Sequence, residues 1–141
     1  MFVGNALLPM SDKYQLFDNN LKVYIASENK VLYPDAFIIS GQEESYQGRD
    51  NVIVNPLVII EIASKSTRNY DRAGKFMSYT SLPSFNEYIL IEQDKPHIES
   101  WFKTSEDNWH KQTVKHITQS IHFRAVDLHF ALKDIYRNIK F

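Results

Sequence analysis

The stretch Leu57-Val58-Ile59-Ile60-Glu61-Ile62-Ala63 decides the fold of this chain. The run is rich in β-branched residues and too short for a helix of ordinary length, so it predicts a strand buried at the centre of a sheet. Glu61 interrupts the run with a carboxylate. A lone ionised group loses its hydration when it is buried, so Glu61 needs a partner or a metal ion.

A second carboxylate stands at the start of another apolar run. Asp35 follows Pro34 and precedes Ala36-Phe37-Ile38-Ile39, which predicts a short strand covered on both faces. Two carboxylates placed at buried strands in this way suggest a cation site.

The segment after Ala63 predicts a crossover connection. Ser66 and Thr67 are residue types that cap helices, and the pattern indicates a helix over 68–80, which ends before Pro83. The apolar segment 87–92 is the next strand. This order predicts two strands joined by a right-handed crossover.

Shorter elements are expected on either side of this unit. They are a strand over 21–25, a polar loop over 40–55 with an edge piece at 52–54, an antiparallel hairpin at the sheet edge over 97–102 and 109–114, extended pieces over 121–123 and 126–130, and a closing helix over 131–139. Structure before Leu21 is expected to be short, because breakers such as Pro9 interrupt it.

Length and composition set further limits. The chain has 141 residues, of which 43% are hydrophobic, which fits a single domain over 1–141. It has no cysteine, which excludes thiolate chemistry and is consistent with a reducing cytoplasm, the expected location. No apolar run reaches the roughly 20 residues that span a bilayer, so no membrane partner is expected. The net charge of −1 gives no global attraction to nucleic acid, so any contact with phosphate must be local.

One local concentration of positive charge follows the Glu61 strand and consists of Lys65, Arg68, Arg72 and Lys75. These side chains could form a cationic rim beside the carboxylates and contact a nucleic acid. A solvated helix face is the simpler interpretation of the pattern taken alone.

Several separated motifs follow one another in a specific order. They are Tyr33-Pro34-Asp35, the run from Asn55 to Ser64, Ser66-Thr67, Asp71-Arg72, Lys75-Phe76, Tyr79 and Ser84-Phe85-Asn86-Glu87-Tyr88. In this order they resemble the Uma-two family of restriction-endonuclease-like proteins, within the PD-(D/E)XK nuclease superfamily. A lone Pro-Asp pair would mean little, whereas an ordered set is specific.

The resemblance implies an α/β fold of the restriction-endonuclease type, a mixed β-sheet flanked by helices. It also implies that Asp35 and Glu61 converge to bind Mg²⁺ or Mn²⁺, and that the backbone carbonyl of Ile62 adds a ligand. DNA is the implied substrate, and hydrolysis of its phosphodiester bonds the implied reaction. A homodimer would supply the two sites needed to cut both strands of a duplex.

The chain departs from the superfamily pattern in two places. The usual catalytic lysine two residues after the acid is replaced by Ala63, and Lys75 on the next helix looks like its substitute. Lys75 could instead pair with Asp71 one helical turn away, and Lys65 is a second candidate. There is no glutamate before Glu28, so the amino-terminal helical segment that carries a further acid is expected to be reduced or missing.

The remaining candidates have structural explanations. Five histidines are spread over the last third without metal-ligand spacing, which argues against a zinc site. Trp101 and Trp109 could stack on bases, but packing on the sheet explains them more simply.

Three hypotheses therefore stand: a Mg²⁺-dependent DNA endonuclease, a catalytically impaired nuclease-fold protein that acts as a binding or assembly module, and an inactive structural remnant.

Overall fold

The computed structural model describes residues 12–64, 70–137 and 139 of the 141. Its main feature is a six-stranded sheet in the order β1-β4-β6-β7-β8-β9. These strands are β1 (Tyr14–Asp18), β4 (Ala36–Ser40), β6 (Val58–Ala63), β7 (Glu87–Glu92), β8 (Ile98–Ser105) and β9 (Asn108–Val114).

The sheet is mixed, as the sequence predicts. β6 and β7 pair in parallel, as the predicted crossover requires, and the other neighbouring strands pair antiparallel. The run that contains Glu61 is an interior strand, and Val58, Ile59 and Ile60 are fully buried in it. The predicted hairpin at the sheet edge is β8–β9.

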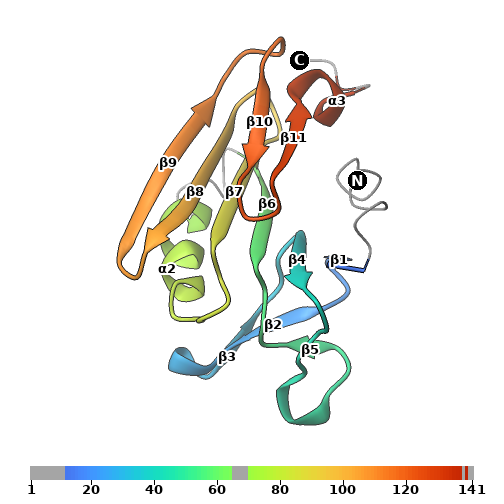
Figure 1. Ribbon diagram of the computed structural model, residues 1–141, viewed down its shortest axis with the longest axis vertical. Helices are drawn as coiled ribbons and strands as arrows, with labels where there is room; N and C mark the ends of the chain where they lie inside the picture. Colours follow the sequence, from blue (N-terminus) through green and yellow to red (C-terminus); the bar gives the residue numbers. More distant parts are fainter. Residues whose placement is uncertain (1–11, 65–69, 138, 140–141) are drawn as a thin grey trace.

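Two smaller sheets complete the strand content of the described residues. β2 (Lys22–Ile25), β3 (Lys30–Leu32) and β5 (Val52–Ile53) form a three-stranded sheet, and β10 (Ser120–Phe123) and β11 (Leu128–Ala131) form a hairpin. In Figure 1 the three-stranded sheet lies at the lower end of the molecule, and β10, β11 and α3 lie together at the upper end.

In the part of the chain that the structure describes, helical segments are few and short. They are the 3₁₀ turns η2 (Ala26–Glu28) and η3 (Tyr46–Gly48), the π-helix η4 (Tyr70–Lys75), and the α-helices α2 (Phe76–Tyr79) and α3 (Leu132–Ile135). No helix among the described residues is long and apolar enough to cross a membrane.

The two faces of the main sheet carry separate hydrophobic cores. On one face, side chains such as Ile60 and Ile89 pack against Phe123 and Phe130 of the β10–β11 hairpin and Leu132 of α3. We call this the hairpin face.

Side chains such as Ile59 and Tyr88 on the other face pack against Tyr79 of α2 and against Val23 and Ile53 of the three-stranded sheet. We call this the helix face. Trp101 and Trp109 are partly buried there, and the ring centroid of Phe76 lies 5.9 Å from Trp101 and 5.0 Å from Trp109. The prediction that the tryptophans pack on the sheet is confirmed.

The helix predicted over 68–80 is confirmed in the described part of that range, as the π-helix η4 followed directly by α2, while 65–69 lie outside the described residues. The second predicted helix is corrected. The closing helix predicted over 131–139 spans only Leu132–Ile135, and Ile139 is 46% exposed. One reason is that the Tyr136 hydroxyl bonds the backbone at Glu92 and His97, which fixes the chain at that point.

Candidate metal site

Strand pairing sets Asp35 beside Glu61. The ladder between β4 and β6 is antiparallel, and its last pair is Ala36 with Ile60. Extended by one position, this register would set Asp35 opposite Glu61. Directly opposite residues of an antiparallel pair have Cβ atoms roughly 4.5–5.5 Å apart, a spacing at which two carboxylates can share one ion.

Both acids belong to the helix face of the sheet. Side chains alternate along a strand, and the neighbours two residues away, Phe37 and Ile59, are buried in the core of that face. Glu61 itself is 1% exposed. Its carboxylate therefore lies in a largely water-excluded layer, where an unbalanced charge would be costly.

A hydrogen bond from the neighbouring strand orients Asp35. The backbone N–H of Ile62 donates to Asp35 Oδ2 at 2.7 Å. Hydrogen bonds to an ionised carboxylate are stronger than neutral ones, so this contact fixes the side chain against β6. The same contact brings the backbone of Ile62 next to Asp35. The family resemblance implies that the carbonyl of Ile62 is a metal ligand.

Lys75 reaches the same place from the π-helix. Its Nζ lies 2.8 Å from Glu61 Oε2, and the lysine side chain is 19% exposed. The sequence left open whether Lys75 turns to the carboxylates or to Asp71, and the structure shows an ion pair with Glu61. The side chain of Asp71 is not described, so a pairing of Lys75 with Asp71 stays a prediction.

The donor set fits a hard cation. It consists of two carboxylates and a backbone carbonyl, and Mg²⁺ commonly takes one or two protein carboxylates and completes its shell with waters and phosphate oxygens. Among the described residues there is no group of three or more His, Cys, Asp or Glu side chains that could hold a metal ion.

Comparison with known proteins identifies the family of this chain. The Uma2 family model, described as "Putative restriction endonuclease", matches residues 2–132. The chain belongs to the Uma2 family. The resemblance inferred from the ordered motifs is confirmed.

Relatives and a solved structure agree with this assignment. The uncharacterized proteins sll1609 and slr1290 of Synechocystis are 28% identical over 106 residues and 24% identical over 127 residues, covering 73% and 90% of this chain. The chain spans only 60% and 65% of their lengths. The crystal structure of a protein from Anabaena variabilis, titled a "putative nuclease belonging to DUF820", matches with a TM-score of 0.73 at 14% identity over 95% of this chain and 74% of that one. This match shows that the fold is nuclease-like.

Uma2 membership makes the surroundings of Ala63 informative. Ala63 is fully buried and pairs with Glu92 of the parallel strand β7. Glu92 is 1% exposed, and Lys95 Nζ lies 3.7 Å from its Oε2. A buried carboxylate therefore lies beside the position where the superfamily has its lysine.

The sequence analysis did not single out Glu92, nor a further buried acid, Glu99. Glu99 is 3% exposed in β8, and His97 Nε2 lies 3.2 Å from its Oε1. Both glutamates lie in segments predicted to be strands, which is the signal that the sequence contains. Glu92 is the last residue of the predicted strand 87–92 and Glu99 belongs to the predicted edge hairpin, and neither position indicates burial.

The predicted nucleic-acid contacts fall largely outside what the structure describes. Lys65 and Arg68 belong to the undescribed range 65–69. Arg72 lies in the π-helix Tyr70–Lys75, but its side chain is not described. Their role stays a prediction.

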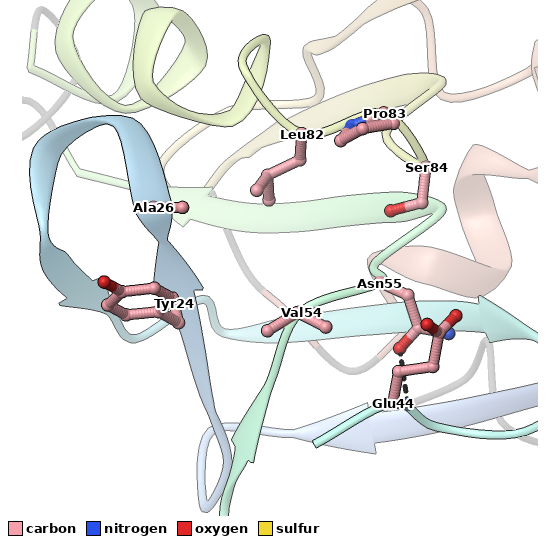
Figure 2. Close-up of a pocket in the computed structure, with 8 residues that line it drawn as sticks. All are labelled: Tyr24, Ala26, Glu44, Val54, Asn55, Leu82, Pro83 and Ser84. Carbon is pink, nitrogen blue, oxygen red and sulfur yellow. Dashed lines mark hydrogen bonds between the residues drawn. The ribbon is translucent and has the colours of Figure 1, made fainter. Parts of the chain in front are cut away.

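A hollow of about 330 Å³ lies at the other end of the central strands (Figure 2). Asn55, which precedes β6, and Ser84, which precedes β7, line it together with Tyr24, Leu82 and other residues. Asn55 is held there, since its Oδ1 accepts the backbone N–H of Glu44 at 2.8 Å. No predicted site residue lines this hollow, and none of its described lining residues is Lys or Arg, so it does not suit a phosphodiester.

Proposed function

We propose that this Uma2 protein is a Mg²⁺-dependent endonuclease that hydrolyses DNA phosphodiester bonds. The observation that carries the proposal is that Asp35 accepts the backbone N–H of Ile62, the neighbour of Glu61, while the Lys75 ammonium lies 2.8 Å from Glu61. Two acids and one cation beside the interior strands of a nuclease-like sheet are the groups that this chemistry requires.

Each residue has a distinct task in this proposal. Asp35 and Glu61 hold the divalent ion, and the carbonyl of Ile62 supplies a further oxygen. Mg²⁺ or Mn²⁺ in such a position would lower the pKa of a bound water and stabilise the charge that builds on the phosphate. The hydrogen bond from Ile62 N–H keeps Asp35 oriented toward β6.

Lys75 is the residue that can change partners. Its ammonium stands at the end of a flexible four-carbon stem, so it can turn from Glu61 to a phosphate oxygen or an attacking water when a metal takes over the charge of the glutamate. Lys65, Arg68 and Arg72 would extend the positive charge along the DNA backbone.

A plasmid-nicking assay with Mg²⁺ or Mn²⁺ tests the proposal. We expect wild type to nick, and Asp35→Asn and Glu61→Gln, which keep side-chain size, to lose activity by a factor of at least about 100. A matched control is Glu28→Gln, an acid paired with Lys30 on the surface. Equal nicking by wild type and both site variants would remove the assignment.

The second candidate is a catalytically impaired binding or assembly module. The favouring observation is that the Glu61 carboxylate is already paired with Lys75, and a lysine can neutralise an acid permanently as well as transiently. Calorimetry separates the two. Binding of Mg²⁺ that Glu61→Gln abolishes supports the nuclease, and no Mg²⁺ binding together with no nicking supports the module.

A further inference from the structure

We propose that the β10–β11 hairpin carries a second metal site, a histidine pair for a late first-row divalent ion such as Zn²⁺, formed by His122 and His129. The two histidines are seven residues apart in the sequence, and the spacing alone argued against a zinc site. The hairpin brings them together, since His122 and His129 are directly paired across the strands.

The two imidazoles lie in register. Their ring centroids are 4.1 Å apart and their planes differ by 3°. The nitrogen lone pairs lie in the ring planes, so both stacked rings must turn about their Cβ–Cγ bonds before one nitrogen of each faces a shared ion. Directly opposite residues have Cβ atoms roughly 4.5–5.5 Å apart, so after this turn the two nitrogens can approach to the roughly 3.4 Å that tetrahedral Zn²⁺ requires.

A carboxylate fixes the orientation and the tautomer of the first ring. His122 Nε2 lies 2.8 Å from Asp127 Oδ1. Because an ionised carboxylate only accepts, the proton of neutral His122 is on Nε2 and the lone pair is on Nδ1. Histidines that bind metals usually donate their other ring nitrogen to a carboxylate in this manner.

The conformation of the turn allows the Asp127 carboxylate to contact His122. Asp127 has a φ of +53°, a left-handed conformation that is uncommon for residues other than glycine, and its N–H closes the turn onto the carbonyl of Arg124 at 3.3 Å. The carboxylate consequently folds back over β10. It remains 86% exposed, so no buried partner competes for it.

The hairpin under the pair is held firmly. Ile121, Phe123 and Phe130 are buried in the hairpin-face core, which leaves the alternate positions 122 and 129 on the outer side. The carboxylate of Glu87 accepts the backbone N–H groups of Arg124 at 3.2 Å and Ala125 at 2.9 Å. Two ligands on a fixed backbone lose little freedom when an ion binds.

The choice of ion follows from the ligands. Neutral imidazole nitrogens suit Zn²⁺, Cu²⁺ and Ni²⁺, whereas Mg²⁺ prefers oxygen. The histidine site is therefore distinct from the Asp35–Glu61 site, and waters would complete the coordination.

The test is calorimetric titration of the untagged protein with Zn²⁺ at neutral pH. We expect one ion per chain, and a loss of affinity of at least about tenfold in both His122→Ala and His129→Ala. His116→Ala is the matched control, because His116 is exposed and lies outside the hairpin, and it should bind as wild type does. Asp127→Gly suits the left-handed backbone and removes the carboxylate, so a loss of about 10–100-fold is expected, with Asp127→Asn retaining more affinity.

Two results would overturn the site. One is Zn²⁺ affinity that is unchanged in both histidine variants, and the other is an equal loss in the His116→Ala control. The variant Asp35→Asn/Glu61→Gln should bind Zn²⁺ at the histidine pair as wild type does, so this test gives its answer whether or not the nuclease proposal holds.

Discussion

Replacing Lys75 by methionine tests the charge balance of the candidate metal site. The substitution keeps most of the side-chain volume and removes the ammonium that lies 2.8 Å from Glu61 Oε2. At that separation and an effective dielectric constant near 20, the attraction is about 6 kcal/mol. Desolvation of the two groups offsets part of it. Removing one partner of a buried pair typically costs about 3–5 kcal/mol.

We expect a loss of about 3 kcal/mol for Lys75→Met, at the lower end of that range, because the Lys75 side chain is 19% exposed and the pair is only partly shielded from water. For a domain of this size the loss corresponds to a fall in Tm on the order of 10 °C. Urea unfolding at neutral pH measures it. Lys30→Met is the matched control: its pair with Glu28 is 3.4 Å long and its side chains are about 40% exposed, so less than about 1 kcal/mol is expected.

The double variant Glu61→Gln/Lys75→Met sharpens the result. Once Glu61 is replaced by a neutral residue, losing the ammonium costs less. The loss of unfolding free energy in the double variant should therefore be smaller than the sum of the losses in the two single variants, by at least about 1 kcal/mol. Mg²⁺ should stabilise Lys75→Met more than wild type, since the ion supplies the missing charge. Equal unfolding free energies for Lys75→Met and Lys30→Met would refute the claim that Glu61 depends on this cation.

Three further predictions concern the parts of the fold that support the site. Burial raises the pKa of Glu87, so the folded state holds its proton more tightly; measured by urea unfolding, wild type should gain stability relative to Glu87→Gln as the pH falls, and the gain should disappear as the pH rises through the folded pKa. Tyr136→Phe removes a hydroxyl that bonds the backbone at His97, and thermal unfolding should show a loss of about 1–2 kcal/mol. Ile60→Ala should cost about 3 kcal/mol in urea unfolding, whereas Ile62→Ala in the same strand, 42% exposed, should cost less than about 1 kcal/mol.

The strands that form the centre of the sheet could be predicted because their sequences agree with their environment. β4 is an apolar run and β6 is an apolar run interrupted only by Glu61, and such runs predict strands buried on both faces. The parallel pairing of β6 with β7 followed from the intervening helical segment. These are local patterns with a single structural solution.

The helices could not be predicted in detail, because tertiary contacts determine where they end. Leu132 and Tyr136 are buried as the apolar pattern requires, yet the Tyr136 hydroxyl is tied to the backbone of Glu92, and the helix ends at Ile135. Propensity contains no information about that bond. The same limit applies to the π-helix, since its hydrogen bonds differ from those on which a 3.6-residue period rests.

The sequence predicts only some of the contacts between residues that are far apart in the chain. Asp35 and Glu61 were paired through an ordered set of motifs, and the register of β4 with β6 supplies the physical reason for their proximity. His122 and His129 had no such signal, because the strand pairing that joins them depends on a turn whose left-handed residue is an aspartate. Asp is tolerated in that conformation but does not predict it.

Two buried glutamates on neighbouring strands show why burial alone does not identify a metal ligand. Glu87 of β7 is paired with Val58 of β6, on the hairpin face of the sheet. Glu61 follows Val58 further along β6, and its side chain lies on the helix face. Glu87 accepts two backbone N–H groups and the hydroxyl of Ser100 at 2.7 Å, donors that are fixed by the fold. Glu61 faces a lysine ammonium on a flexible stem. A carboxylate bound by the backbone cannot exchange those donors without local unfolding, whereas an ammonium on a flexible stem can give way to a metal ion, which is why the proposed function assigns the divalent cation to Glu61 and not to Glu87.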